Sequence, residues 1–339
     1  MQLVLCIVSL IFTGGDMSKQ ILVLGSINVD HVLRVNRFPK PGQTITGSSY
    51  NIMAGGKGAN QAVACARLGG NTHMMAAIGQ DDLGREIVQQ LSDEGVDTTA
   101  ITEVVDMDTG VALIFVNAKG ENIIGISAGA NGCLREEHIE QNHSLITDAD
   151  YLLLQQEVPE SVILQAAHIA RENNTKVALN PAPAREFSND YLLAIDLITP
   201  NQTEAEIITG IKASDEKSAR QAAGILHEKG IPDVAITMGQ IGVYVSSISS
   251  GHPKGLIVPG FPVKAVDTTA AGDTFNGALL VALAEGKSLE DAALFANASA
   301  GLSVMSAGSQ SSIPYRFQVE EFIQCDQEIA GALETLHTS

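Results

Sequence analysis

The sequence has no tryptophan and few basic residues. Only 20 Lys and Arg stand against 39 Asp and Glu among its 339 residues, so the net charge is −19, and no run of Lys or Arg departs from this balance. The balance argues against a nucleic-acid partner, because such binding depends on cations that displace counterions from phosphates. With 45% hydrophobic residues, 32 Gly and 11 Pro, the composition is otherwise that of an ordinary globular protein.

Cysteine is also scarce. The four cysteines, Cys6, Cys65, Cys133 and Cys325, show no CxxC spacing, and the eight histidines form no pair at metal-ligand spacing. These spacings argue against a zinc site and against a disulfide framework. We expect buried thiols in a cytoplasmic protein.

No apolar run is long enough to cross a membrane. The N-terminal run from Leu3 to Phe12 is too short, and no Lys or Arg precedes it as in a signal peptide. Met17 leads almost directly into the β-rich stretch 21–24. We expect residues 1–16 to be an N-terminal extension outside the fold and a candidate for a mis-called start, with an extra strand as the alternative.

Short apolar runs of strand length alternate with helical patterns along most of the chain. Strands are expected at 21–24, 151–154, 177–179, 197–199 and 234–237, and helices at 59–68, 161–172, 215–229 and 274–284. This alternation predicts an α/β fold, a doubly wound, mostly parallel sheet with helices on both faces. Because no linker or internal repeat interrupts the pattern, we expect residues 17–339 to form a single domain.

Two stretches, about 32–53 and 109–127, break the pattern with alternating polar and apolar residues. They predict two antiparallel hairpins, which together would make a small inserted β-sheet. We expect this sheet to be a lid over a ligand crevice, since long excursions from compact domains are usually functional. A decorative edge hairpin is the alternative.

Two glycine-rich segments stand directly before expected helices. In the first, from Ala54 to Asn60, backbone amides can approach an oxygen-rich or anionic ligand; a tight structural turn with Lys57 as a solvated charge is the alternative. It is not a Walker A loop, because Gly58 stands where that motif has Ser or Thr. In the second, 267–277, the amides of Ala271, Gly272 and Asp273 could hold a phosphate while the Asp273 carboxylate faces it. The alternative there is a helix start that complements the dipole.

Polar residues also follow several expected strands, where side chains point into the ligand crevice of an open α/β sheet. Asn28 and Asp30 follow the first strand and suit sugar hydroxyls, although both are ordinary turn formers. Asn201 enters a helix, as part of a polar shell around phosphate and metal or only as an N-cap. Segment 237–242 supplies a hydroxyl and two glycines, with a plain hairpin turn as its alternative.

Together these segments resemble the ribokinase and phosphofructokinase-B family of carbohydrate kinases. The resemblance runs nearly end to end from about Gln20, and its motifs occur in order. They are 25–31 (GSINVDH), 55–60 (GGKGAN), 129–132 (GANG), 179–185 (LNPAPAR), 201–204 (NQTE) and 267–277 (DTTAAGDTFNG). The family's fold agrees with the fold expected from the strand and helix pattern.

The resemblance implies transfer of the γ-phosphate of ATP to the 5-hydroxyl of D-ribose, with Asp273 as general base and an anion hole at Ala271, Gly272 and Asp273. The implied sugar contacts are Asn28, Asp30, Gly56, Lys57, Gly58, Asn60, Glu157 and Asp273. The implied nucleotide side is Asn201, Glu204, Thr237, Gly239, Gly242, Gly272 and Asn297. It further implies Mg²⁺, a homodimer formed through the lid, and K⁺ at Asp267, Thr269, Ser303, Ser306, Gly308 and Ser312.

Two other functions stay open at this point. Another sugar or nucleoside kinase of the same fold, such as a fructokinase, a deoxyribokinase or an adenosine kinase, would share the phosphate-binding segment and differ around the sugar. An inactive sensor of a sugar or nucleotide would keep the fold and lose turnover. The intact Asp273 and the small residues before it argue against the sensor.

Overall fold

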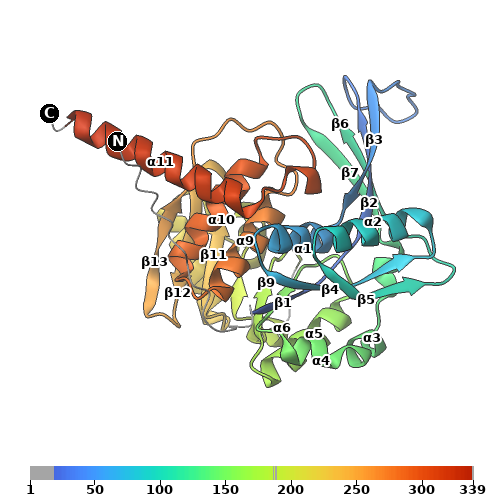
Figure 1. Cartoon of the computed structure of the whole chain (residues 1–339), viewed down its shortest axis with the longest axis horizontal. Helices are drawn as coiled ribbons and strands as arrows, with labels where there is room; N and C mark the ends of the chain where they lie inside the picture. Colours follow the sequence, from blue (N-terminus) through green and yellow to red (C-terminus); the bar gives the residue numbers. More distant parts are fainter. Residues whose placement is uncertain (1–18, 186, 188, 338–339) are drawn as a thin grey trace, which may run out of the picture.

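The computed structural model describes residues 19–185, 187 and 189–337, so the expected extension at 1–16 lies outside the described residues. The main body is built on one nine-stranded sheet (Figure 1). Its strands are β1 (Gln20–Leu24), β4 (Asn71–Gly79), β5 (Asp97–Val104), β8 (Tyr151–Leu154), β9 (Lys176–Leu179), β10 (Leu197–Ile198), β11 (Asp233–Thr237), β12 (Gly242–Ser247) and β13 (His252–Pro259).

The strand order is β13-β12-β11-β10-β9-β8-β1-β4-β5. From β5 to β11 every neighbouring pair is parallel, which confirms the mostly parallel sheet. At the other edge β12 and β13 are antiparallel, an addition that the strand pattern does not predict. The short 3₁₀ turn 239–241 between β11 and β12 reverses the chain, so segment 237–242 is a hairpin connection.

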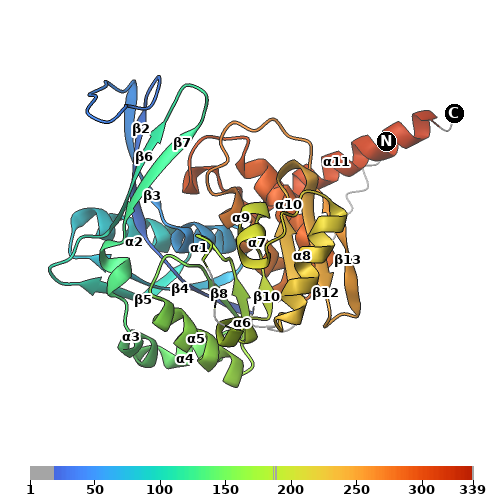
Figure 2. The same cartoon turned by 180° about the vertical axis from the view of Figure 1, so that it is seen from behind.

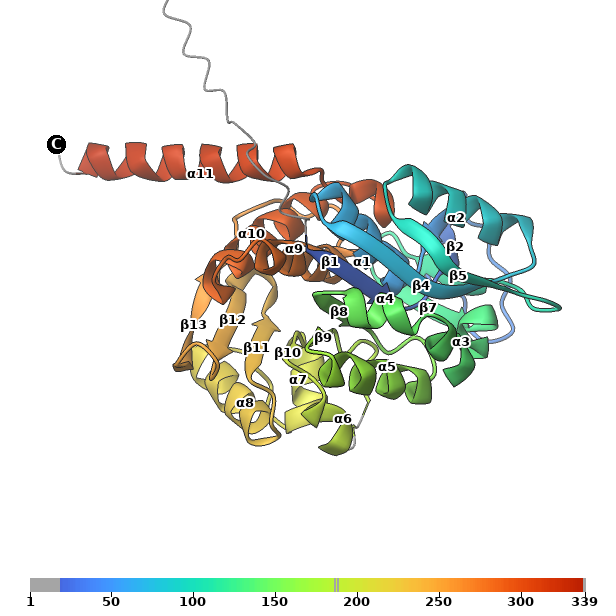
Figure 3. The same cartoon turned by 60° about the horizontal axis from the view of Figure 1, so that its bottom comes forward.

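Helices cover both faces of this sheet (Figure 3). One face carries α1 (Lys57–Arg67), α2 (Asp82–Asp93), α9 (Ala271–Ala284) and α10 (Leu289–Ser303). The other carries α3 (Glu136–Gln141), α4 (His143–Asp148), α5 (Glu160–Glu172), α6 (Asn189–Leu193), α7 (Gln202–Thr209) and α8 (Glu216–Glu228), while α11 (Arg316–His337) extends away from the body.

Strand β1 shows why both faces need cover. Its side chains alternate, so Ile21 and Val23 join the buried cluster under α1 and α9, whereas Leu22 and Leu24 join the cluster under α5 and α8. An apolar strand of this kind is buried on both sides. Among the described residues, no helix combines the length and the apolar character needed to cross a membrane.

A second, four-stranded sheet projects from the body (Figures 1 and 2). Its order is β3-β2-β6-β7, from β2 (Asn28–Arg34), β3 (Ser49–Gly55), β6 (Gly110–Val116) and β7 (Asn122–Ser127). Both expected hairpins are present, and β2 and β6 join them in parallel. We call these four strands the lid sheet. Its first strand begins at Asn28, four residues before the expected boundary.

Two further expectations need correction. Helix α1 begins at Lys57 rather than at residue 59, so the glycine-rich segment runs into the first turn of the helix. The cysteines were expected to be buried, but of the three that the structure describes only Cys65 is; Cys133 is half-buried and Cys325 is exposed. The thiols of these two lie near the surface, where packing does not enclose them.

Candidate active site

The carboxylate of Asp273 lies where α1 meets α9. It is 6% exposed and belongs to the first turn of α9. Asn60 Nδ2 donates to its Oδ2 over 3.0 Å, and Gln61 Nε2 donates to its Oδ1 over 3.0 Å. Both donors come from α1, so helix packing fixes the direction of the carboxylate. Each oxygen keeps a further acceptor position for a substrate hydroxyl.

Asn28 and Asp30 follow β1, as expected, but they already belong to β2 of the lid sheet, which was expected to begin at about residue 32. Both are buried, and Asn28 Oδ1 accepts from Asn131 Nδ2 over 2.8 Å. The Asp30 carboxylate packs directly on Gly55, where a Cβ atom would come within 2.1 Å of Asp30 Oδ2. A glycine is therefore required beside the acid.

Asp30 sits in an acidic neighbourhood. Burial, followed by the carboxylates of Glu157 and Asp273, raises the pKa of Asp30 to about 7, and Lys57 opposes this shift. Burial disfavours a lone charge, and nearby like charges add to the effect. The charge of this side chain therefore changes near neutral pH.

Lys57 supplies the positive charge among these acids. Burial alone would lower the pKa of its ammonium group, but four carboxylates raise it, in the order Asp273, Glu157, Glu204 and Asp30. The backbone N–H of Lys57 donates to Glu157 Oε2 over 3.2 Å, and Ser26 Oγ donates to the same atom over 2.6 Å. Lys57 is thus a half-buried cation, not the solvated charge of the alternative interpretation.

The glycines of the first segment allow close backbone approach. Gly56, at the N-cap of α1, has φ 91°, a left-handed conformation that favours glycine. A Cβ on Gly58 would lie 2.6 Å from the backbone of Gly25 and Ser26. The segment therefore packs against the turn after β1 and brings the start of α1 to Asn28 and Glu157.

The N-terminus of α9 is open. No side chain caps this helix, and its N-cap residue, Ala270, has φ 59°, which is unusual for a residue other than glycine. The first-turn amides of a helix have no intrahelical acceptor. At Gly272 an added Cβ would meet nothing within 4 Å. The Ala271 N–H donates to the Thr268 carbonyl over 3.3 Å, so the N–H groups of Gly272 and Asp273 lead this uncapped helix start beside the Asp273 carboxylate, a suitable place for an anion.

The expected nucleotide residues form a second group beside the first. Asn201 is the N-cap of α7, which was the alternative to a role in a polar shell around phosphate and metal. Its Oδ1 accepts from the N–H groups of Thr203 and Glu204 over 2.9 Å each. Thr237 lies beside it in a one-residue bridge between strand ends. Burial raises the pKa of Glu204, against the effects of the Asn201 N–H and Lys57. Glu204 and Lys57 affect each other's pKa, and Asp30, Glu157 and Asp273 also act on Lys57. Lys57 therefore couples the expected nucleotide residues to these three acids.

Asn297 and the glycines near Thr237 complete that side. Asn297 is buried, and its Nδ2 donates to the carbonyls of Val258 and Pro259 over 3.0 Å each, so its amide ties α10 to β13. Gly239 has φ 61° with open space around its missing side chain, and Gly242 has φ 111°. The hairpin after β11 therefore leaves room beside Gly239.

The six expected K⁺ residues lie on two adjoining segments, 267–269 and 303–312, and Ser303 is the last residue of α10. Asp267 Oδ1 accepts from the Thr269 hydroxyl over 2.7 Å, and Asp267 Oδ2 accepts from the Gly308 N–H over 3.2 Å. The Asp267 N–H donates to the carbonyl of Val304, the residue after α10. The remaining residues, Ser303, Ser306 and Ser312, belong to the segment 303–312. In the described part of the chain, no three His, Cys, Asp or Glu side chains gather as metal ligands.

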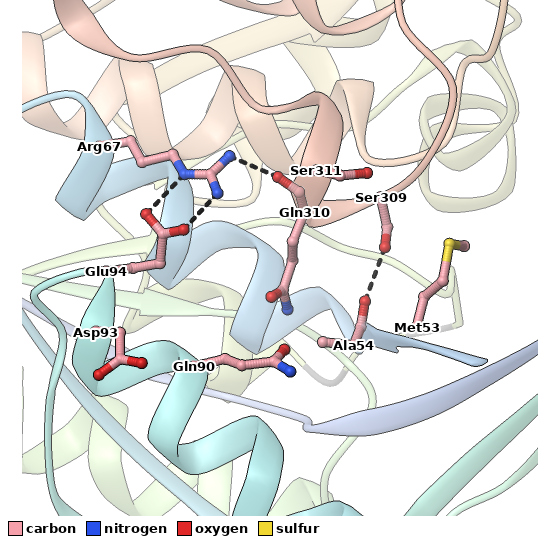
Figure 4. Close-up of a pocket in the computed structure, with 9 residues that line it drawn as sticks. All are labelled: Met53, Ala54, Arg67, Gln90, Asp93, Glu94, Ser309, Gln310 and Ser311. Carbon is pink, nitrogen blue, oxygen red and sulfur yellow. Dashed lines mark hydrogen bonds and ion pairs between the residues drawn. The ribbon is translucent and has the colours of Figure 1, made fainter. Parts of the chain in front are cut away.

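A cavity of about 380 Å³ lies next to this assembly rather than within it (Figure 4). It is bordered on one side by the end of β3 and on the other by segment 309–311, which are joined by a 2.8 Å bond from Ser309 Oγ to the Ala54 carbonyl. Arg67 closes a further side through its paired bonds to Glu94. The cavity thus borders both the glycine-rich segment and the loop expected to bind K⁺.

Three further polar residues have no role in the expected site, although one of them, Asn131, lies in the motif 129–132. Gln61 contacts Asp273 directly, Gln155 donates to Gln61, and Asn131 holds Asn28. All three side chains are buried. Little in the sequence singles these residues out. Gln61, for example, directly follows Asn60, but apart from its polarity it resembles any residue on the buried face of a helix.

The sequence profile of the family described as pfkB family carbohydrate kinase matches residues 18–316. The chain is 49% identical over 308 residues to the ribokinase of Haemophilus influenzae, covering 91% of this chain and 99% of that protein. It is 36% identical over 309 residues to a deoxyribokinase of Salmonella typhi, covering 91% of this chain and 99% of that one.

Solved structures support the same family. The structure of Arabidopsis thaliana ribokinase complexed with ribose and ATP superposes with a TM-score of 0.84 at 33% identity, covering 90% of this chain and 99% of that one. The ribokinase of Thermotoga maritima gives a TM-score of 0.80 at 37% identity over similar shares, 90% and 99%. By profile, identity and fold, the chain belongs to the pfkB family of carbohydrate kinases.

Proposed function

We propose that the protein transfers the γ-phosphate of ATP to the 5-hydroxyl of D-ribose, giving D-ribose 5-phosphate and ADP. Asp273 carries this proposal, since its buried carboxylate is oriented by α1 beside the uncapped start of α9. The 49% identity to a ribokinase and the fold shared with a ribokinase that binds ribose and ATP support the same substrates.

Asp273 would act as general base. A primary hydroxyl is a poor nucleophile, so the carboxylate accepts its proton as the oxygen attacks the γ-phosphorus in line, and the β–γ bridging oxygen leaves with ADP. Asn60 and Gln61 keep the carboxylate in one orientation. Phosphoryl transfer leaves little covalent chemistry to the protein, so no phosphoenzyme is required.

The start of α9 would hold the transferring phosphoryl group. Backbone N–H groups at Ala271, Gly272 and Asp273 present partial positive charge where negative charge develops. Lys57 adds a full charge from α1, on the same side as Asp273. The residues around Thr237 and Glu204 would bind the nucleotide.

The sugar would bind between the lid sheet and α1. Asn60 Oδ1 is a buried acceptor without a partner among the described residues, which suits a ligand hydroxyl. Asp30 and Asn28 offer further oxygens from β2, and Glu157 another from the loop after β8. A ribose placed there would have its reacting hydroxyl toward Asp273.

Two cations fit the donor sets present. Mg²⁺ favours carboxylate and phosphate oxygens, and Glu204 on the nucleotide side is the buried carboxylate suited to it. When bound, Mg²⁺ would neutralise charge on the ATP phosphates. K⁺ would be held by the all-oxygen set of Asp267, Thr269 and the loop 303–312, whose position beside α9 would steady the anion hole.

The lid sheet would also form a homodimer. Pairing register places Tyr50, Ile52, Leu113 and Ile123 on the face of the sheet opposite Asp30, and these side chains are 47–54% exposed. An apolar face of this kind marks an interaction surface. We further propose that residues 17–339 form a single domain and that the protein is cytoplasmic.

A sugar panel tests this function. Purified protein is assayed for ADP formation with ATP and each of D-ribose, 2-deoxy-D-ribose, D-fructose and adenosine, with Mg²⁺ and K⁺ present. We expect the highest kcat/KM with ribose. Higher kcat/KM with deoxyribose would instead favour the function of the 36% identical deoxyribokinase. Absence of turnover with every acceptor would favour a sensor.

A further inference from the structure

We propose that Gln61 is a positioning residue for Asp273, and that Gln155 supports the direction in which the Gln61 amide points. Gln61 lies on α1 and is fully buried. This inference rests on the proposed role of Asp273 as base, but it concerns residues that the expected site did not include.

The Gln61 amide is saturated with partners. Its Nε2 donates to Asp273 Oδ1 over 3.0 Å and to Asn180 Oδ1 over 3.1 Å, which uses both N–H groups. Its Oε1 accepts from Gln155 Nε2 over 2.6 Å. A flip of the amide would place Oε1 against two acceptor oxygens and the NH₂ group against the NH₂ of Gln155. One orientation alone therefore satisfies all three contacts.

Gln155 reinforces the orientation that the acceptor oxygens of Asp273 and Asn180 already favour. Its own Oε1 is buried without a partner among the described residues, and it lies where a Cβ on Gly25 would be only 1.9 Å away. A buried acceptor without a donor destabilises the fold, so its orientation needs a compensating contact. That contact is the donor bond to Gln61, which supports the orientation in which Gln61 presents its N–H groups to Asp273.

The rigid sheet sets the positions of these partners. Gln155 directly follows β8 and Asn180 directly follows β9, at the carboxyl ends of adjacent parallel strands. Gln61 thereby connects the sheet to the base on α9. A neutral amide suits this task, because it holds a carboxylate in place without titrating beside it.

Substitution of Gln61 tests the role through two variants. Gln61→Leu should lower kcat about 10- to 100-fold, as expected for a misplaced reacting group, with KM for ribose and ATP within about threefold of wild type. Gln61→Glu places a like charge beside Asp273. In a plot of kcat against pH, the low-pH side of the curve should move to higher pH by about one unit or more. The reason is that a neighbouring carboxylate raises the pKa of the base.

Gln155→Leu tests the orienting step and keeps the inference falsifiable if Gln61→Leu does not fold. It should lower kcat by a smaller factor, and the double variant should match Gln61→Leu, because Gln155 acts through Gln61. Independent roles would instead multiply the two losses. That outcome would overturn the role given to Gln155.

Gln156→Leu is the matched control. Gln156 is the next residue along, is also buried, and donates to Tyr191 Oη over 2.5 Å, away from Asp273. Its kcat and pH profile should stay those of wild type, with thermal unfolding measured for every variant. Unchanged kcat and pH profile in folded Gln61 variants would overturn this inference alone. A wild-type protein that phosphorylates no sugar would overturn it together with the proposed function.

Discussion

Asn60 Nδ2 donates to Asp273 Oδ2 over 3.0 Å, although the two residues lie 213 positions apart in the chain. The bond joins the starts of α1 and α9, the two helices that the glycine-rich segments open. The two glycine-rich segments therefore meet at one carboxylate, as the proposed reaction would require for acceptor and donor to react in line.

Removal of the base should stop turnover without stopping binding. Asp273→Asn keeps the shape of the side chain but cannot accept a proton, so kcat should fall about 10²- to 10⁴-fold. KM for ribose and ATP should change little. ADP release under saturating substrates measures the effect, and ligand-induced shifts in melting temperature verify that both substrates still bind. Near-normal turnover would remove Asp273 from the role of base.

Ribose binding should weaken in acid because of Asp30. Its pKa is raised to about 7, so the carboxylate form that accepts sugar hydroxyls is lost as pH falls through 7. The ionised fraction differs about tenfold between pH 6 and pH 8, and KM for ribose should be higher at pH 6 by roughly that factor. Steady-state kinetics at fixed ATP measure it, and Asp30→Asn should flatten the profile.

The same carboxyl group affects the stability of the ligand-free protein. Its pKa is higher folded than unfolded, so the folded state binds more protons between about pH 4 and pH 7 and stability falls as pH rises through that range. Asp30→Asn removes the penalty. The variant should therefore melt above wild type at pH 8, and the difference should shrink toward pH 4. An equal shift at both values would contradict this account.

Monovalent cation should activate the enzyme through the loop at Asp267. Exchange of K⁺ for a bulky organic cation should lower kcat, and Asp267→Ala should give similarly low activity with or without K⁺. Asp267 also accepts from Thr269 and Gly308, so thermal unfolding of the variant is the control for loop integrity. An enzyme indifferent to K⁺ would exclude the site.

Arg67 should contribute strongly to stability. Its guanidinium forms a two-pronged pair with Glu94 and donates to the carbonyls of Gln310 and Ile313, which ties α1 to the loop after α10. Arg67→Ala should cost about 2 kcal/mol, because it leaves the half-buried Glu94 carboxylate and two carbonyls without their donor. Urea unfolding measures the loss. Arg85→Ala, which removes an arginine from exposed ion pairs, should leave the midpoint unchanged.

A charge on the outer face of the lid sheet should dissociate the dimer. Leu113 is 54% exposed on the face opposite Asp30, so Leu113→Lys would place an ammonium group in the apolar interface. Light scattering coupled to gel filtration should show a monomer. The matched control is Leu256→Lys, at a 45% exposed leucine on β13, which should stay dimeric. A wild-type monomer would contradict the proposed assembly.

Local patterns predicted much of the fold. The apolar runs at β1, β8, β9 and β11 and the alternation around 32–53 are strong signals, because burial on two faces and burial on one face leave different periodicities. The edge strands β12 and β13 gave no such signal, since one of them is partly exposed and carries mixed residues. The sequence likewise did not predict which strands pair with one another, because strand pairing joins segments that are far apart in the chain.

The sequence alone determined the residue types of the site. Glycines before a helix and the acid at Asp273 predict a phosphate site because their chemistry is local. Tertiary structure decided what surrounds them: Asn28 and Asp30 lie on the lid sheet, four carboxylates raise the pKa of Lys57, and Gln61 accepts a hydrogen bond from Gln155. Orientation and pKa depend on neighbours that are distant in the chain, 94 positions for Gln61 and Gln155 and 212 for Gln61 and Asp273, and only the packed sheet and helices bring them together.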